Sequence, residues 1–241
     1  MSHRTISALL LAVTMAALGT VGAHPAAAGG PPRPRSVIVH QPARHGPVGV
    51  VVLHGLGGSP ERQAQVWNAT ADRYGFTAIY PSAAGPDRSW NAGQCCGTSA
   101  RVHRDDVGYL DRVISVARAR YGVRTVYLAG FSNGGMLAYA YACARPWAIP
   151  AVYIAASTYT RGRPCPGYTG RALHEHGQLD QIIPPGGMAF APHLGCPLLP
   201  VLAIPGQLSN AQVTVRILPG RGHSWMVTSP ATAWAFFGAG R

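Results

Sequence analysis

The chain has 241 residues, a formal net charge of +12 and only eight carboxylate side chains. All twenty basic residues are arginine, which excludes Schiff-base chemistry on a lysine and the lysine of a phosphate-binding P-loop. Because the arginines are scattered singly, without the aromatic residues that line a single-strand groove, we expect no nucleic-acid partner. With 47% hydrophobic residues, the chain can bury one sizeable core.

The N-terminal residues 1–28 predict a secretory signal peptide. A basic start precedes an apolar stretch over residues 8–18 and a small-residue ending, and the apolar part is too short for a stable membrane span. No cysteine precedes Cys95, so we expect no lipid or membrane anchor and a protein that is secreted. Residues 29–35 are rich in proline, glycine and arginine and predict a flexible lead-in. One domain is expected over residues 36–241.

The cysteines of an exported chain indicate disulfide bonds, and their odd number leaves one unpaired. Two of them are adjacent, which is not the spacing of a metal-binding knuckle, so no metal site is expected. Adjacent cysteines rarely bond each other comfortably, so each is expected to pair elsewhere. The pairing stays open, with Cys143 and Cys165 as the favoured pair. The five residues are Cys95, Cys96, Cys143, Cys165 and Cys196.

Along the chain, helical signatures alternate with apolar runs that predict buried strands. Ser59 can cap a first helix, with Pro60 at its first position. Asp105 or Asp106 can cap a second, which Gly122 closes in a left-handed C-cap position. This alternation predicts a mostly parallel sheet with helices on both faces. The expected order is strand 48–53, helix 59–74, strand 76–80, helix 105–121, strand 125–129, helix 136–144, strands 151–155, 173–176 and 213–218, and helix 231–237.

The motif G-x-S-x-G at residues 130–134 is the strongest chemical signal. Such a pentapeptide is common in a glycine-rich chain, where it can be an ordinary turn, but here a predicted strand precedes it and a predicted helix follows. That setting holds a serine, Ser132, on a strained turn with its hydroxyl exposed. The amide of Asn133 would lie at a helix N-terminus, directed at a developing oxyanion.

A serine nucleophile needs a base, and the base needs an acid that fixes its tautomer. In this kind of fold the order along the chain is serine, acid, histidine. Only Glu175 and Asp180 follow the serine, and Asp180 is favoured because it lies in the loop beyond a strand's C-terminal end. The later histidines are His193 and His223. His223 is favoured because it lies in a glycine-flanked loop after the last strand, whereas His193 is expected at the surface.

A second oxyanion donor is expected in the glycine-rich loop 54–58, which follows an early strand. The amide of Leu56 is the first candidate and that of Gly55 the second. His54 is expected to orient the loop and not to act in catalysis. A phosphate cradle is disfavoured because neither the lysine nor the G-x-G-x-x-G spacing is present.

Six motifs occur together in one order, and with them the chain resembles the secreted α/β-hydrolases that group polyhydroxybutyrate depolymerases with feruloyl and acetylxylan esterases. The LpqC-like members are the most similar. The segment SWNAGQCCG is the specific motif, since HGLGG and GFSNGG fit many hydrolases. The motifs are HGLGG (54–58), SWNAGQCCG (89–97), DDVGYL (105–110), GFSNGGM (130–136), HGQLD (176–180) and GRGHSW (220–225).

The resemblance implies carboxylic-ester hydrolysis through an acyl-enzyme, with Ser132, Asp180 and His223 as the catalytic triad. It also implies that Trp90, Asn91 and Trp225 contact the substrate. A structural role for Trp90, as a lid over the sheet edge, is the alternative. Asp105 and Asp106 are expected to cap the helix and brace the loop and not to take part in the chemistry.

The segment between Asp180 and His223 is short and rich in proline and glycine, so no large cap domain is expected. We expect a monomer without cofactor that cleaves short acyl, hydroxycinnamoyl or polyhydroxyalkanoate-type esters, the substrate being soluble, polysaccharide-linked or a polyester. A peptidase or acyltransferase of the cell envelope with the same triad is one alternative. Another is a non-catalytic secreted protein whose basic surface binds anionic polymers. The sequence does not distinguish the possible esters or acyl acceptors.

Overall fold

The computed structural model describes residues 35–225 and 228–238. The predicted signal peptide, residues 1–28, and residues 29–34 of the predicted lead-in lie outside this part of the chain. Arg35 was assigned to the flexible lead-in, but the structure contradicts that assignment. Its guanidinium group lies 2.5 Å from the carboxylate of Asp106 and over the rings of Trp90 and Tyr109. The domain therefore begins at least one residue earlier than predicted.

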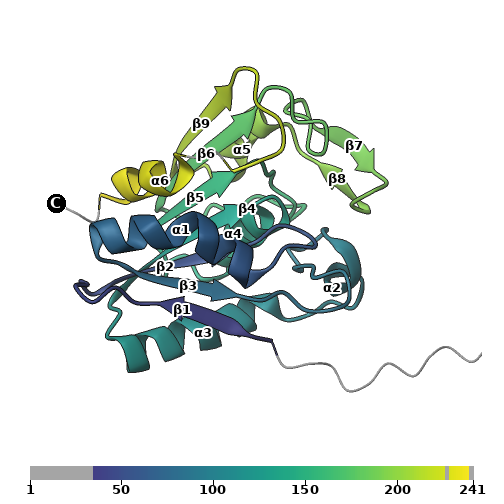
Figure 1. Ribbon diagram of the computed structural model, residues 1–241. Coiled ribbons are helices and arrows are strands. Elements are labelled where there is room, and N and C mark those ends of the chain that lie inside the picture. Colours follow the sequence, from purple (N-terminus) through teal and green to yellow (C-terminus); the bar gives the residue numbers. More distant parts are fainter. Residues whose placement is uncertain (1–34, 226–227, 239–241) are drawn as a thin grey trace, which may run out of the picture. The chain divides into compact units, whose positions relative to one another are not determined.

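A seven-stranded sheet forms the centre of the domain (Figure 1). β1 pairs with β3 in antiparallel fashion, and the other neighbouring strands of this sheet are parallel, which confirms the mostly parallel sheet. The short edge strand β1 was not predicted. The order across the sheet is β1 (Val37–His40), β3 (Thr77–Pro81), β2 (Val48–Leu53), β4 (Thr125–Phe131), β5 (Ala151–Ala155), β6 (Arg171–Gly177) and β9 (Gln212–Leu218).

Helices cover both faces of this sheet (Figure 1). On one face, Val50 and Val52 of β2 belong to the same apolar cluster as Trp67 of helix α1 (Pro60–Tyr74) and residues of α6 (Ser229–Phe237). On the other face, Val51 and Leu53 pack with residues of α3 (Asp106–Tyr121) and α4 (Asn133–Ala144). Successive residues of a strand point to opposite faces, so the continuous apolar run of β2 is buried on both sides, as predicted.

The predicted helix ends of α1 and α3 are confirmed. The Ser59 hydroxyl accepts a hydrogen bond from the Arg62 amide, and the Asp105 carboxylate accepts one from the Gly108 amide at 2.7 Å. Gly122 ends α3 in the left-handed region with φ 67°, a conformation that glycine adopts without the steric cost of a Cβ atom.

Between β6 and β9 the structure contains a small antiparallel pair, β7 (Met188–Ala191) and β8 (Cys196–Leu198). These strands were not predicted. With four and three residues, they are too short to show the alternation of a longer strand. Two short helical turns follow, and another lies after the cysteine pair, but no large cap domain is present in the described part of the chain. The short helices are α2 (Gly97–Arg101), the 3₁₀ turn η1 (Val201–Ala203) and α5 (Ile204–Gln207). None of the described helices is long and apolar enough to cross a membrane.

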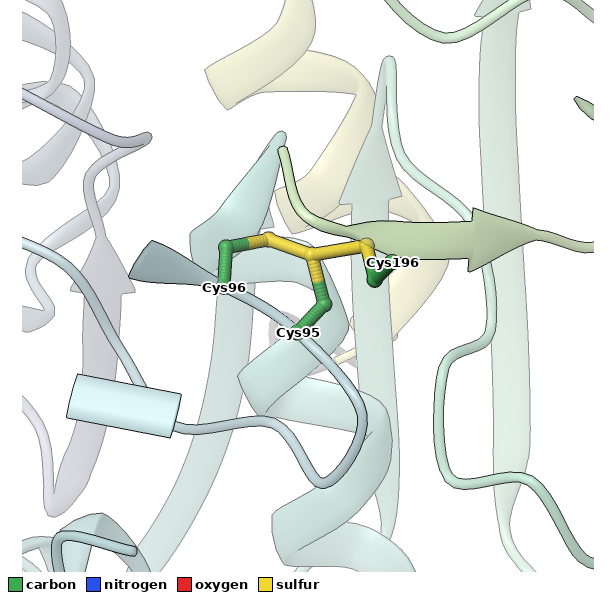
Figure 2. A group of neighbouring side chains, drawn as sticks. All are labelled: Cys95, Cys96 and Cys196. Atoms are coloured by element: carbon green, nitrogen blue, oxygen red, sulfur yellow. A yellow bond between two sulfur atoms is a disulfide. The ribbon is translucent and has the colours of Figure 1, made fainter. Parts of the chain in front are cut away.

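The five cysteines form two groups. Cys143 and Cys165 are paired, as favoured from the sequence. In the second group the sulfur of Cys95 lies between those of Cys96 and Cys196 and within bonding reach of both (Figure 2). Because one sulfur can form only one disulfide, one of these three buried cysteines keeps a thiol. The group of three ties the segment after Trp90 to the β7–β8 pair.

One of the two possible bonds has the Cα separation that is usual for a disulfide. Disulfides usually join Cα atoms that are about 4.4–6.8 Å apart. Cys95 and Cys196 are 5.4 Å apart, whereas Cys95 and Cys96 are 3.0 Å apart. We therefore expect the disulfide between Cys95 and Cys196, whose separation lies within this range. The three sulfurs lie close enough together to be considered as ligands of one metal ion, but a bond between two of them leaves a single thiol, which is not enough for such a site.

Candidate active site

Ser132 lies at the turn between β4 and α4, where the G-x-S-x-G motif was expected to place it. Its backbone has φ 52° and ψ −123°, a conformation that is strained for any residue with a Cβ atom and that is found at functional sites. Two hydrogen bonds hold the turn. The Ser132 amide donates to the Ala155 carbonyl at 3.0 Å, and its carbonyl accepts from the Ser157 hydroxyl at 2.7 Å.

The flanking glycines of the motif are required by close backbone approach. A Cβ atom on Gly130 would collide with the backbone of Gly134 and Gly135. A Cβ atom on Gly134 would collide with the carbonyl oxygens of Leu53 and His54 in the neighbouring strand and loop. The motif therefore allows α4 to begin directly against the end of the sheet, which places the serine at the carboxyl ends of the parallel strands, where sites of such sheets lie.

Three predicted residues from distant parts of the chain meet at this turn. His223 Nε2 lies 3.0 Å from Ser132 Oγ, and His223 Nδ1 lies 2.8 Å from Asp180 Oδ2. The carboxylate can only accept, so the neutral imidazole carries its proton on Nδ1 and presents the lone pair of Nε2 to the serine hydroxyl. This is the relation of nucleophile, base and orienting acid that acyl transfer requires.

Asp180 is held by the turn that follows it. Its Oδ1 accepts hydrogen bonds from the amides of Ile182 and Ile183 at 2.9 and 2.8 Å, which leaves Oδ2 for His223. Glu175, the competing candidate, is engaged elsewhere: its carboxylate accepts from the Tyr153 hydroxyl at 2.7 Å and lies 3.4 Å from Arg216. Of the two carboxylates, Asp180 is thus the one that contacts His223.

The loop that carries His223 is anchored on both sides. On one side, the Leu179 amide donates to the Arg221 carbonyl at 2.7 Å, and the close approach leaves no room for a Cβ atom on Gly177. On the other side, Trp225 packs on Phe131 and Tyr153, and its indole N–H donates to Gln63 at 2.9 Å. These contacts fix the His223 loop, and the half-buried Trp225 stays a predicted substrate contact.

The loop 54–58 lies against the nucleophile, as expected for a second oxyanion donor. A Cβ atom on Gly55 would lie 3.1 Å from the Cβ of Ser132, so Gly55, the residue before Leu56, lies beside the serine. His54 shapes this loop. Its Nε2 accepts from the Ala83 amide at 3.0 Å, so its Nδ1 donates to the Gly55 carbonyl at 2.7 Å. Burial lowers the pKa of His54, and the neutral ring remains a structural element, as predicted.

Trp90 does not line an open cleft, which corrects the prediction for this residue, whereas Asn91 is half-buried and borders one of the cavities described below. Trp90 is fully buried, its ring packs on His54, and its indole N–H donates to the His54 carbonyl at 2.9 Å. The Asn91 side chain donates to the Arg104 carbonyl and accepts from the Gly93 amide, and the Asn91 amide donates to Asp106 at 2.7 Å. Both residues therefore brace the loop that supports the site, and Asp106 braces it too, as expected.

The Asn133 side chain has a function that the sequence did not reveal. Its Oδ1 accepts from the Trp90 amide at 2.7 Å, and its Nδ2 donates to the Trp90 carbonyl at 3.0 Å. One residue thus places its own amide at the start of α4 and clamps the Trp90 loop beside the oxyanion loop. A polar residue directly after the nucleophile was the available signal, because it occupies a buried helix start where its side chain needs a partner.

Two cavities of about 550 and 540 Å³ lie near the site but not over the serine, since Ser132, Asp180 and His223 line neither of them. The first is bounded by Gln94, Tyr159 and the β7–β8 pair. Asn91 and Arg161 are among the residues that line the second. The nucleophile itself is 5% exposed.

Comparison with known proteins agrees with this architecture. Residues 49–191, more than half of the chain, match the model of the alpha/beta hydrolase fold family. The chain belongs to this family. The α/β-hydrolase is 30% identical over 111 residues to a bifunctional acetylxylan esterase/xylanase of Neocallimastix patriciarum, a match that covers 44% of this chain and 15% of that protein.

Solved structures share the fold of this α/β-hydrolase at low sequence identity. An acetyl xylan esterase from Aspergillus awamori is 14% identical with a TM-score of 0.61, and the match covers 85% of this chain and 94% of that one. Est1E from Butyrivibrio proteoclasticus, solved with ferulic acid, is 13% identical with a TM-score of 0.60 and the same coverage of both chains. At these identities the likeness establishes the fold.

Proposed function

We propose that this α/β-hydrolase is a serine esterase that cleaves carboxylic esters through an acyl-enzyme on Ser132. The observation that carries the proposal is the continuous hydrogen-bonded series from the strained serine through His223 to Asp180, with distances of 3.0 and 2.8 Å. A buried serine turn of this kind costs folding free energy. Its combination with a correctly oriented base and acid is the arrangement that activates a hydroxyl as a nucleophile.

In the first half of the reaction, Ser132 Oγ attacks the ester carbonyl while its proton moves to His223 Nε2. The resulting imidazolium is stabilised by the Asp180 carboxylate at Nδ1. The protonated Nε2 then donates its proton to the leaving alcohol, which departs and leaves the acyl group on the serine. The amides of Ile182 and Ile183 keep Asp180 directed at the histidine throughout.

Negative charge develops on the carbonyl oxygen during the attack, and backbone amides stabilise it. The Asn133 amide is the first of α4, where helix N–H groups lack intrahelical partners and the helix dipole favours an anion. The Leu56 amide, next to Gly55 on the other side of the serine, is the second donor. The buried Trp90 and His54 hold these two segments together.

In the second half, a water molecule attacks the acyl-enzyme with His223 as its base, and Ser132 is released as the leaving group. The chain's own residues supply every proton transfer and the charge stabilisation in this scheme. No cofactor is therefore part of the proposal.

The proposed substrates are short acyl, hydroxycinnamoyl or polyhydroxyalkanoate-type esters, soluble or attached to a polymer. The names of the similar proteins, an acetylxylan esterase/xylanase and a structure with bound ferulic acid, support the first two classes. The N-terminal segment 1–28 supports a secreted enzyme. We further propose that the enzyme acts as a monomer.

A substrate panel tests the proposal. Purified protein is assayed with p-nitrophenyl acyl esters, methyl ferulate, acetylated xylan, polyhydroxybutyrate and a peptide p-nitroanilide. We expect ester turnover and a loss of about 10⁴-fold or more in Ser132→Ala, with no loss in Ser115→Ala, which alters an exposed serine of α3. Turnover that survives Ser132→Ala refutes the mechanism, and cleavage of the anilide alone refutes the esterase assignment.

A further inference from the structure

A line of buried polar side chains runs from the interior to the proposed acid. The Tyr139 hydroxyl lies 2.9 Å from His174 Nδ1, and His174 Nε2 lies 3.1 Å from His176 Nδ1. His176 Nε2 lies 2.7 Å from the Ile183 carbonyl oxygen and 3.4 Å from Asp180 Oδ2. Both histidines are buried, and the reaction described above uses neither of them.

The far end of this line fixes the position of every proton in it. The Ile183 carbonyl can only accept, so His176 carries its proton on Nε2. Its Nδ1 must then accept from His174 Nε2–H, and His174 Nδ1 must accept from the Tyr139 hydroxyl. All three donors therefore point in the same direction, towards the Asp180 turn.

Both rings are neutral in this arrangement. Burial lowers the pKa of His174 to about 3 and lowers that of His176 as well. The groups that face His176 are His174, the Ser157 carbonyl, Ile183, Asp180 and His223. A neutral donor can hold the Asp180 turn without adding a positive charge that would compete with the His223 imidazolium.

His176 acts on both oxygens of the acid. Its Nε2–H faces Asp180 Oδ2, the oxygen that His223 uses. The same N–H holds the carbonyl of Ile183, whose amide donates to Asp180 Oδ1. Fixing the peptide units of this turn therefore fixes the direction of the carboxylate.

We propose that His176, supported by His174 and Tyr139, is a positioning residue that sets the orientation and basicity of Asp180 towards His223. The proposal rests on the function proposed for Ser132. His176 touches neither the nucleophile nor the substrate, and its effect passes through the acid alone.

Two polar substitutions of His176 distinguish the positioning role from a role in packing alone. In His176→Gln, the side-chain amide nitrogen can occupy the position of Nε2 and donate to Ile183. In His176→Asn, the shorter side chain places its nitrogen near the position of Nδ1, and the donor to Ile183 is lost. Both variants keep a polar group in the same pocket, so a merely structural role predicts similar behaviour.

Loss of the donor leaves Asp180 less stabilised as a carboxylate and thus a stronger partner for protonated His223. The pKa of His223 should rise, and the acid limb of kcat/KM should move to higher pH. Looser orientation of the acid should lower kcat by about tenfold, with KM changed by less than about twofold. His176→Gln should recover most of kcat and the original pH profile.

The experiment measures kcat, KM and the pH profile with p-nitrophenyl acetate, and titrates the His223 ring by NMR in the same proteins. His40→Leu, at a half-buried histidine that is paired with Asp72 and remote from the His176 line, is the control for loss of a histidine. A raised His223 pKa and a shifted acid limb in His176→Asn, both reversed in His176→Gln, support the proposal. Equal behaviour of the two variants overturns it.

If His176→Asn does not fold, Tyr139→Phe is the second test, because it removes only one hydroxyl from the line. It should shift the His223 titration in the same direction, and an unchanged titration overturns the proposal. The NMR readout also separates the two hypotheses. An inactive wild type would refute the esterase function, whereas the dependence of His223 on His176 would still be measured.

Discussion

Replacing Asn133 by alanine tests the clamp that joins the nucleophile helix to the Trp90 loop. The substitution keeps the backbone amide proposed for the oxyanion hole and removes only the two side-chain hydrogen bonds to Trp90, at 2.7 and 3.0 Å. Both groups on Trp90 are buried, so water does not easily replace the lost partner. The variant should therefore be destabilised well beyond the loss of an ordinary surface contact.

The magnitude follows from the two groups that lose a partner. A buried donor or acceptor left unsatisfied costs about 1–3 kcal/mol. The Trp90 amide loses its side-chain acceptor, so the cost for this group should be near the upper end of that range. The Trp90 carbonyl still accepts from the Cys96 amide at 3.0 Å, so the cost for this group should be near the lower end. We expect the free energy of unfolding to fall by about 2–4 kcal/mol.

Urea denaturation gives this free energy, provided that the slope with urea is the same in variant and wild type. Asn210→Ala is the matched control, since Asn210 is exposed and makes one bond, from Nδ2 to the Pro166 carbonyl at 2.9 Å. The control should lose less than about 0.5 kcal/mol. If Asn133→Ala loses no more than this control, the clamp does not hold the loop and the reasoning fails.

Three further predictions concern the acid, the buried histidines and the cysteines. Asp180→Asn should lower kcat by about 10³- to 10⁴-fold, and Glu175→Gln by less than about tenfold; steady-state kinetics with the reverse ranking would contradict the assignment. Burial lowers the pKa of His174 to about 3, below about 6.5 in the unfolded chain, so the unfolded state binds one more proton between these values and stability falls as the pH falls. Urea titrations between about pH 4 and 5.5 give the change of the free energy of unfolding with pH, and this slope should be smaller by about 1.4 kcal/mol per pH unit in His174→Phe than in the wild type. An unchanged slope would mean that the ring is protonated in the folded protein. Alkylation after unfolding, followed by peptide mapping, should find one free thiol, on Cys96, with Cys95 bonded to Cys196; a label on Cys196 would show the adjacent pair instead.

The central strands and the covering helices could be predicted from the sequence because their burial leaves a pattern. β2 is apolar at every position from Val50 to Leu53, as burial on both faces requires, and α3 has an acidic cap and a closing glycine. β7 and β8 leave no such pattern. They are only four and three residues long, β7 is mostly exposed and β8 contains a proline, and Cys196 of β8 lies within bonding reach of Cys95 in a distant loop.

The candidate triad was predictable because few alternatives exist. Only two carboxylates follow Ser132 in the chain, and the loop position separates Asp180 from Glu175. Trp90 shows the limit of such reasoning. A loop has no periodicity that reveals which way a side chain points, so a tryptophan near the motif was assigned to the substrate when it is in fact buried against His54.

His176 could not be assigned from the sequence for a different reason. Its role depends on the direction of each hydrogen bond in a line that joins α4, β6 and the Asp180 turn. From the motif HGQLD alone, the sequence indicates only that this histidine is close to the acid along the chain. The proton positions follow from the Ile183 carbonyl. Only the tertiary structure places this carbonyl beside the His176 ring.

Covalent labelling of the folded protein tests the central claim most directly. The protein is incubated with a serine-directed alkyl phosphonate, and its mass and modified peptide are determined. One adduct per chain on Ser132 is expected, absent after unfolding in urea and absent in Ser132→Ala. A folded protein that forms no adduct on Ser132 would contradict the proposed nucleophile and the esterase function with it.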